Sequence, residues 1–152
     1  MLKQVSTSNV SDAMHRRGEM SGLMQVSNVK KFFGKAFTVR AYPGDWSKTV
    51  QAIDAAERGD VIVIDAHESR VALWGALATM SAISRGIAGL VIDGAVRDIE
   101  EIKRLASPYS RAMSARLQGS QRAWASFPCP LSALEPRSTQ MIIYWRTKTV
   151  LS

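Results

Sequence analysis

Hydrophobic positions in the first two thirds of the chain follow two alternating patterns: short continuous apolar runs, and apolar residues spaced three or four apart. The continuous or β-branched runs predict three strands, at residues 33–42, 60–65 and 89–92. The spaced pattern, with Ser, Thr or Asp at its start, predicts four helices, at residues 7–17, 47–58, 73–84 and 98–105. Alternating strands and helices favour an α/β layer whose strands are mostly parallel.

The segments that follow the predicted strands are the first candidates for a site, because loops at the carboxyl ends of parallel strands build the binding crevice in such sheets. Two of these segments are residues 66–75, after the run DVIVID, and residues 93–98, after GLVI. We expect the chemistry of the protein to lie in these two loops. In the preceding helix, Ser47 is the predicted cap.

The composition is that of one ordinary globular domain, with 152 residues of which 46% are hydrophobic and 22% charged. No apolar run approaches the roughly 20 residues of a membrane span. The N-terminus lacks the apolar core of a signal peptide, so we expect a cytoplasmic protein with no membrane partner. The lone Cys129 and the two histidines argue against an internal disulfide and a zinc cage, which leaves carboxylates as the expected metal ligands.

The last third of the chain has a different composition. Acidic and basic residues balance over residues 1–102, so the whole net charge of +7 lies in residues 103–152, together with four of the five prolines. We divide the chain into a domain, residues 1–116, and an atypical basic tail, residues 117–152. The tail shows neither the helical nor the strand period, and only residues 141–145 resemble a strand.

A positive net charge indicates nucleic-acid binding only where it forms a patterned surface. The basic tail has no aromatic interleaving at sheet spacing and no known motif, and the pairs Arg16-Arg17 and Lys30-Lys31 are too small for a binding face. We therefore predict no specific nucleic-acid partner. A glycine-rich phosphate loop and an S-adenosylmethionine fingerprint are also absent from the sequence.

Several segments of the domain follow a recognisable pattern: TSNVSDAMHRRGEMSGL, GKAFTV, GDW, AIDAAERGDVIVIDA and ALWGALATMSAISRGIAGLVIDGAVRDIEEI. Over about residues 5–116 they resemble the family called regulator of ribonuclease E activity A, most specifically in VIDGAVRD. That family includes metal-dependent 4-hydroxy-4-methyl-2-oxoglutarate aldolases and proteins long mislabelled demethylmenaquinone methyltransferases. The variants TSNVSDAMHR and GDW are most similar to the form fused to 3-hexulose-6-phosphate synthase.

The resemblance implies an α/β fold of the swivelling β/β/α sandwich type, whose C-terminal part is incomplete or aberrant in this chain. It also implies assembly as a homotrimer or hexamer. In its aldolases the Arg-Asp pair after GAV is the chemical centre, and this pair matches Arg97 and Asp98. The implied roles are a catalytic and substrate-binding one for Arg97, and for Asp98 the binding of a divalent metal, Mg²⁺ or Mn²⁺, mostly through water.

The resemblance further implies where the substrate carboxylate binds. The predicted helix start at residues 74–77 matches the family segment whose backbone N–H groups receive that carboxylate, which is a common use of a helix N-terminus. The implied substrate-binding residues of this segment are Gly75, Ala76 and Leu77. Glycine at residue 75 allows close approach of the backbone.

The implied function is that of a divalent-metal-dependent lyase acting on a small 2-oxo acid substrate. It would cleave 4-hydroxy-2-oxo acids of the 4-hydroxy-4-methyl-2-oxoglutarate type to pyruvate, with oxaloacetate decarboxylation as a side reaction, because both pass through pyruvate enolate. No lysine falls in either predicted loop, which disfavours a Schiff base. Two other functions stay open: a non-catalytic protein that docks on and regulates a ribonuclease, and an accessory domain of 3-hexulose-6-phosphate synthase.

The same residues also have simpler interpretations. Asp98 and Glu101 have the spacing of a capping box, in which Asp98 would cap its own helix. Arg97 alone fits a surface ion pair. His67 fits either a general base or an exposed loop residue.

This chain departs from the family pattern at three places. His67-Glu68 stands where the pattern has Gly-Gly, and Ala76 stands where it has an acidic residue. The C-terminal segments of the family, with Gly-Gly, Pro-Gly-Asp and Asp-Gly-Val-Val, have no match. The substrate pocket is therefore expected to differ from that of the aldolases.

The unmatched C-terminal segments have a genetic explanation. When the third base of each codon from Gln140 is joined to the first two bases of the next, the shifted frame permits Asp-Asp-Tyr-Leu-Leu-Ala-Asp-Glu-Asp-Gly-Val. This resembles the family ending Pro-Gly-Asp-x-Ile-x-Ala-Asp-x-Asp-Gly-Val. Our hypothesis is that residues from about 117 onward are a frameshifted reading of that ending, which also accounts for the changed composition.

Overall fold

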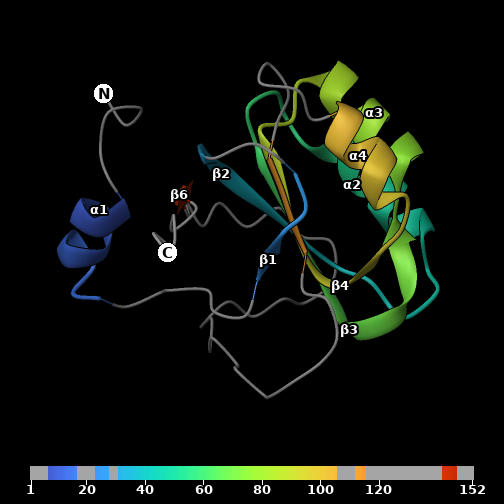
Figure 1. The fold of residues 1–152 in the computed structure, drawn as a ribbon, viewed down its shortest axis with the longest axis horizontal. Helices are drawn as coiled ribbons and strands as arrows, with labels where there is room; N and C mark the ends of the chain where they lie inside the picture. Colours follow the sequence, from blue (N-terminus) through green and yellow to red (C-terminus); the bar gives the residue numbers. More distant parts are fainter. Residues whose placement is uncertain (1–6, 17–22, 28–30, 106–111, 116–141, 147–152) are drawn as a thin grey trace.

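The computed structural model describes residues 7–16, 23–27, 31–105, 112–115 and 142–146. Its strands are β1 (Met24–Gln25), β2 (Lys31–Arg40), β3 (Val61–Trp74), β4 (Gly89–Val96), β5 (Ala112–Ala115) and β6 (Ile142–Arg146). They form one six-stranded sheet in the order β1-β5-β4-β3-β2-β6 (Figure 1). The four central strands are parallel, and β1 and β6 pair antiparallel at the two edges. The predicted α/β class with mostly parallel strands is confirmed.

The helices are α1 (Thr7–Ala13), α2 (Ser47–Ala55), α3 (Ala76–Arg85) and α4 (Ile99–Leu105). Figure 1 shows α2, α3 and α4 together on one side of the sheet, whereas α1 lies apart and contacts β6. As predicted, a glycine ends α3: Gly86 has a φ of 89°, the left-handed conformation that closes a helix. Within the described ranges, no helix has the length and apolar character needed to span a membrane.

Apolar clusters cover both faces of the central strands. Ile62 packs in the main cluster with Ile53 of α2 and Ile102 of α4. Val61, its neighbour along β3, packs in a second cluster with Val91 on the opposite face, since successive side chains of a strand point to opposite sides. Burial on both faces explains why the run DVIVID is continuously apolar rather than alternating.

β3 is longer than the apolar run that predicts it. It extends to Trp74, so the predicted loop at residues 66–75 is mostly strand, and that prediction is wrong. The pairing with β4 shifts register between Asp65 and Ser69 and again between Ser69 and Trp74. Bulges of this kind place extra polar residues in a strand, which hides the strand from a hydrophobic pattern.

The second predicted loop is also shorter than expected. β4 runs to Val96, so only Arg97 and Asp98 of residues 93–98 connect it to α4. α3 begins at Ala76 rather than at residue 73, because residues 73 and 74 are the end of β3. The two site segments are therefore strand ends with short connections, which hold their side chains more rigidly than long loops would.

The start of α2 differs from the prediction in its cap. Ser47 is the first helical residue rather than the cap. Its backbone N–H donates to Asp45 Oδ1 over 3.1 Å, and its hydroxyl donates to the same oxygen. These bonds, the hydroxyl bond foremost, lower the pKa of Asp45 because they stabilise the charged carboxylate. The side-chain oxygen that accepts hydrogen bonds at the start of α2 therefore belongs to Asp45 and not to Ser47.

Most of the basic tail at residues 117–152, including the predicted frameshift boundary, lies outside the described residues. The strand predicted at residues 141–145 is confirmed as β6. β6 pairs with residues 31–35 of β2, whereas residues 36–40 of β2 pair with β3. The one described segment in the second half of the tail thus completes an edge of the sheet.

Candidate functional site

Arg97 and Asp98 connect β4 to α4 at the carboxyl end of the parallel strands. The Arg97 N–H donates to the Trp74 carbonyl over 3.0 Å, which fixes this connection beside the end of β3. The Asp98 carbonyl accepts the Ile102 N–H over 2.9 Å and so begins the bonding of α4. Asp98 has a φ of 59°, a left-handed conformation that Asp tolerates better than most residues. Both side chains are therefore held at the sheet edge by the backbone on either side.

Gly75 brings the start of α3 against these two residues. A Cβ at this position would lie 2.7 Å from Asp98 Oδ2 and 3.0 Å from Arg97 Nε, so the Arg97 and Asp98 side chains would have to shift to make room for it. Its φ of −155° is extended backbone that any residue adopts, so glycine here provides space for these two side chains rather than a special conformation. The structure thus brings together the predicted residues Gly75, Ala76, Arg97 and Asp98.

The Asp98 carboxylate bonds to the neighbouring helix. Its Oδ2 accepts a hydrogen bond from the Ala76 N–H over 3.2 Å and lies 3.6 Å from Arg97 Nε. A carboxylate at a helix N-terminus satisfies an N–H group and the helix dipole, so Asp98 caps α3. Glu101, its partner in the predicted capping box, bonds to Arg104 instead. The interpretation of a capping box within α4 is therefore wrong.

The peptide between Gly75 and Ala76 is also held from its other side. The Gly75 carbonyl accepts a hydrogen bond from the Thr79 hydroxyl over 2.9 Å. That hydroxyl accepts one from the indole Nε1 of Trp74 over 2.8 Å. Trp74 is 3% exposed and Thr79 7%, so these bonds are sheltered from water. They tie the end of β3 to the first turn of α3.

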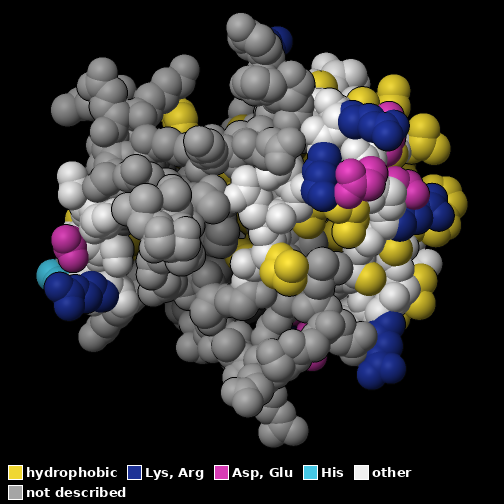
Figure 2. Space-filling view, viewed as in Figure 1, with side chains coloured by type: hydrophobic (Ala, Val, Ile, Leu, Met, Phe, Trp, Pro, Cys, Tyr) yellow, Lys and Arg dark blue, Asp and Glu magenta, His cyan; other side chains and the backbone are white. Residues whose placement is uncertain are grey.

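An open pocket of about 520 Å³ lies at this edge, lined by Ala76, Asp98, Ile99, Glu100, Glu101 and Arg104. Its acidic side chains have basic neighbours: Lys103 donates to Glu100 over 2.8 Å, and Arg104 to Glu101 over 3.2 Å. Figure 2 shows acidic and basic side chains next to one another on the helical side of the molecule. The bond from Lys103 lowers the pKa of Glu100, because it stabilises the carboxylate.

Asp98 fits a metal ion that keeps most of its water. In the part of the chain that the structure describes, no three His, Cys, Asp or Glu side chains gather to hold an ion. Structural zinc and calcium sites take more protein ligands than one, whereas Mg²⁺ binds through one or two carboxylates and several waters. The Asp98 side chain is 46% exposed, and its Oδ1 makes no hydrogen bond within the described residues. Asp98 alone would hold Mg²⁺ or Mn²⁺ mostly through water, as the resemblance implies.

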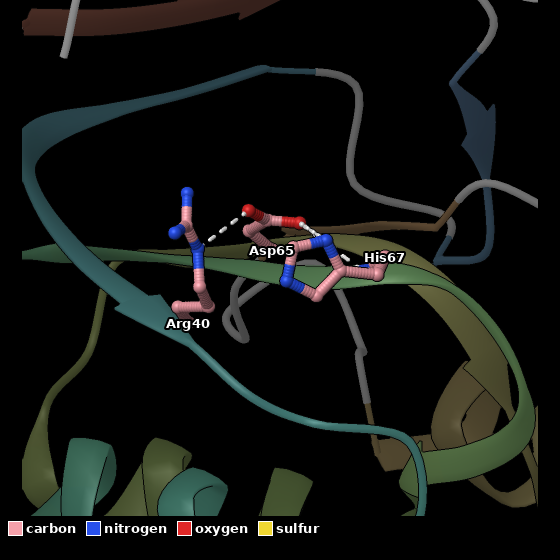
Figure 3. A network of polar contacts seen from close by, with 3 residues as sticks. All are labelled: Arg40, Asp65 and His67. Atoms are coloured by element: carbon pink, nitrogen blue, oxygen red, sulfur yellow. Dashed lines mark hydrogen bonds and ion pairs between the residues drawn. The ribbon is translucent and has the colours of Figure 1, made fainter. Parts of the chain in front are cut away.

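A second polar cluster lies where the carboxyl end of β2 meets the middle of β3 (Figure 3). The Asp65 carboxylate lies between Arg40, whose Nε is 3.2 Å from Oδ2, and His67, whose Nδ1 is 3.7 Å from Oδ1. The Tyr42 ring lies beside the His67 ring, with 6.4 Å between their centroids. His67 does not line the pocket of Asp98. Of its two interpretations, the general base therefore gains no support, and His67 is a partly exposed partner of Asp65.

His67 and Glu68 share an uncommon backbone conformation. Their φ angles are 50° and 55°, in the left-handed region that glycine adopts most readily. These are the two positions where the family pattern has Gly-Gly. The bulge in β3 thus keeps a glycine-type geometry although both residues carry side chains.

Two side-chain contacts near the sheet could not be seen in the hydrophobic pattern of the sequence. Arg40 and Asp65 lie opposite each other in the register of β2 and β3, and that register is not visible in the sequence. Thr79 was overlooked although it follows Trp74 by about one helical turn, a spacing that could have pointed to their contact. Of the residues that the sequence predicts to bind substrate, Ala76 lines the pocket, whereas Gly75, Leu77 and Arg97 do not, and Leu77 is 78% exposed at the start of α3.

Known proteins resemble this chain over most of its length. The family model described as RraA-like, Aldolase/RraA, matches residues 7–134. An uncharacterized protein of Methanocaldococcus jannaschii is 35% identical over 111 residues, which are 71% of this chain and 52% of that protein. A protein of Halalkalibacterium halodurans, provisionally named a 4-hydroxy-4-methyl-2-oxoglutarate aldolase, is 35% identical over 109 residues, 70% of this chain and 52% of that protein. The chain spans about half the length of these relatives.

A solved structure extends the likeness to the fold. The RNA-processing inhibitor RraA from Thermus thermophilis superposes with a TM-score of 0.65 and 26% sequence identity, over 74% of this chain and 66% of that one. The family-model match over residues 7–134 contains strands β1 to β5, helices α2, α3 and α4 and the Arg97-Asp98 connection. The chain therefore belongs to the RraA-like family, Aldolase/RraA.

Proposed function

We propose that this chain is a divalent-metal-dependent lyase acting on small 2-oxo acids. Its reaction is cleavage of a 4-hydroxy-2-oxo acid, of the 4-hydroxy-4-methyl-2-oxoglutarate type, to pyruvate, with oxaloacetate decarboxylation as a side reaction. The observation that carries the proposal is the meeting of Arg97, Asp98 and the Ala76 N–H beside one open pocket. The provisional aldolase name of a relative supports the same reaction class.

In this proposal Asp98, Arg97 and the start of α3 have different roles. Asp98 would hold the ion, and a divalent ion at this place supplies Lewis-acid stabilisation of negative charge on the 2-oxo oxygen. Arg97, 71% exposed beside Asp98, donates to the same developing charge. The first-turn N–H groups of α3, at Ala76 and Leu77, would receive the substrate carboxylate, and the Ala76 N–H would exchange its bond to Asp98 Oδ2 for one to the substrate. Together these groups stabilise the enolate, with its additional negative charge, more than the bound substrate, which is the requirement for catalysis.

Cleavage and decarboxylation need the same arrangement. When the bond between carbons 3 and 4 of the hydroxy acid breaks, the 4-hydroxyl loses its proton to a base and becomes a carbonyl, and the electron pair of the broken bond stays on pyruvate enolate. Loss of CO₂ from oxaloacetate leaves the same enolate, and in both reactions the enolate takes a proton from water at carbon 3 to give pyruvate. No lysine lies in residues 66–75 or 93–98, so an enolate stabilised by charge is favoured over a Schiff base.

The test is pyruvate release from 4-hydroxy-4-methyl-2-oxoglutarate and from oxaloacetate, with Mg²⁺ or Mn²⁺ and with a chelator. We expect metal-dependent release that Asp98→Asn abolishes, because the amide still accepts the Ala76 N–H but binds a cation poorly. Glu101→Gln is the matched control, since it removes one charge from the same pocket at a carboxylate that bonds to Arg104 and not to the Ala76 N–H. Release without metal dependence contradicts the lyase, and an active Asp98→Asn contradicts the metal assignment.

A second candidate is a non-catalytic protein that regulates a ribonuclease. It is favoured by the structural likeness to the RNA-processing inhibitor RraA and by the exposed apolar side chains of α3, Leu77 at 78% and Met80 at 51%. Such a protein needs this outer surface and not Asp98. Inhibition of a ribonuclease that Leu77→Asp removes and Asp98→Asn leaves intact would favour the regulator over the lyase.

A further inference from the structure

Consecutive hydrogen bonds connect the buried core to Asp98. The indole N–H of Trp74 can only donate and the Gly75 carbonyl can only accept, so the Thr79 hydroxyl accepts from the first and donates to the second. The Gly75 carbonyl and the Ala76 N–H belong to one planar peptide. That N–H donates to Asp98 Oδ2, which makes Asp98 the last acceptor of the series.

The series has two physical consequences. Because the peptide is planar, any rotation of the Gly75 carbonyl also turns the Ala76 N–H away from its acceptor. Because each bond polarises the next, the bonds that the carbonyl accepts make the N–H a stronger donor. The carbonyl accepts two such bonds, from the Thr79 hydroxyl at 2.9 Å and from the Thr79 N–H at 3.1 Å.

We propose that Trp74 and Thr79 are positioning residues that set the direction and donor strength of the Ala76 N–H. Their action reaches Asp98 through the Gly75-Ala76 peptide, and neither side chain lines the pocket. The contact with Asp98 is independent of any reaction. The extension to a substrate carboxylate at the same N–H rests on the proposed function.

A role in stability alone is the competing explanation, because both side chains are buried. The chain contains a matched case that separates the two. Thr49 in α2 is 2% exposed, and its hydroxyl donates to the Trp46 carbonyl over 2.6 Å, while its N–H donates to the same carbonyl over 3.1 Å. Thr49 thus makes the same pair of bonds at the start of a neighbouring helix, with no connection to Asp98.

The first experiment follows the Ala76 amide by NMR in the whole chain, without metal or substrate. Thr79→Val keeps the side-chain shape and removes the hydroxyl, so we expect hydrogen exchange at Ala76 to accelerate about tenfold. Its amide proton should move upfield, as expected for a weakened hydrogen bond. Thr79→Ser should restore both values, Trp74→Phe should give a smaller change in the same direction, and Thr49→Val should leave Ala76 unchanged.

The second experiment measures oxaloacetate turnover with Mg²⁺. An N–H that binds the carboxylate equally in ground and transition states affects KM and not kcat, so Thr79→Val should raise KM about tenfold with kcat nearly constant. An unchanged Ala76 amide in Thr79→Val, or an equal change in Thr49→Val, overturns the proposal. If the amide responds but the unmodified chain releases no pyruvate, the proposed function fails and the positioning role stands.

Discussion

At the scale of single residues, Gly75 is the position where an added side chain would meet both Arg97 and Asp98. A methyl group there would meet Asp98 Oδ2 at 2.7 Å and Arg97 Nε at 3.0 Å. We predict that Gly75→Ala lowers metal-dependent pyruvate release by about a hundredfold, because misplacement by an ångström is enough for such a loss. The free energy of unfolding should change by less than about 1 kcal/mol, since the backbone suits alanine.

Gly44→Ala is the control for this change. Gly44 has a φ of 86°, and apart from its chain neighbours no atom of the described residues lies within 4 Å of its missing Cβ, so alanine there is strained but meets no described side chain. We expect Gly44→Ala to lose about 1 kcal/mol of stability in urea unfolding with full pyruvate release. A Gly75→Ala protein as active as the parent would show that the reaction takes place elsewhere.

The strained bulge in β3 gives a second prediction at this scale. Glu68 has a φ of 55°, a conformation that costs a non-glycine residue about 1 to 2 kcal/mol. Glycine would remove this cost, but it also loses more backbone entropy on folding, which offsets part of the stabilisation. We predict that Glu68→Gly stabilises the protein by about 0.5 to 1 kcal/mol in urea unfolding. Arg70→Gly, on the same strand without a positive φ, should instead destabilise it by a similar amount. Equal losses in both variants would argue against stored strain.

A residue of the site could be predicted from the sequence when its role is tied to a contiguous motif, and not when it depends on contacts between distant segments. Arg97, Asp98 and Gly75 were identified from a contiguous motif by resemblance. The role of Asp98 as the acceptor of the Ala76 N–H could not be predicted, because it depends on how the start of α3 and the connection before α4 meet in space. The same holds for Asp65 and Arg40, which a strand register brings together.

At the scale of helices and strands, ends marked by special backbone geometry were predictable and others were not. Gly86 ends α3 because glycine takes a left-handed φ easily. The far ends of β3 and β4 were missed, since bulged and polar residues interrupt the apolar pattern there while the backbone pairing continues. The predicted positions of all four helices are confirmed within a few residues.

The start of α2 provides a prediction with a pH dependence. Asp45→Ala should lower the thermal unfolding midpoint at neutral pH, because it removes the acceptor of the Ser47 N–H and hydroxyl. Folding lowers the pKa of Asp45 from its ordinary 3.8, so its contribution is complete above that value and is lost as the pH falls through the lower folded pKa. The difference between the parent and Asp45→Ala should therefore shrink below pH about 4.

Asp45→Asn separates the charge from the hydrogen bonds. Its amide oxygen still accepts both bonds but does not titrate in this range. We expect a midpoint close to that of the parent at neutral pH and a smaller decrease on acidification. A difference between Asp45→Ala and the parent that stays constant down to pH about 2 would contradict the role assigned to the carboxylate.

At the scale of the whole molecule, the chain combines a balanced domain with a basic tail. We predict that its coding DNA, read in the shifted frame from about codon 117, continues through Asp-Gly-Val-Val. The match to the family model runs to residue 134, past the predicted boundary at about residue 117, and the predicted shifted motif begins at Gln140. Sequencing of the gene checks this directly. The same shift applied within codons 1–102 is the control and should give no family motif, whereas a shifted tail without Asp-Gly-Val-Val would refute the hypothesis.

The pairing of β6 with β2 also affects how the protein reaches its fold. Lys31 lies opposite Arg146, so this contact joins segments from nearly opposite ends of the chain, whereas β2, β3 and β4 are linked by short helical crossovers. During synthesis the N-terminal segments leave the ribosome first, and contacts between distant segments form slowly. Until β6 emerges, half of β2 exposes unpaired N–H and C=O groups that another nascent chain could bind. The period of greatest aggregation risk is therefore late in translation, when a chaperone that shields this edge would most increase the yield of folded protein.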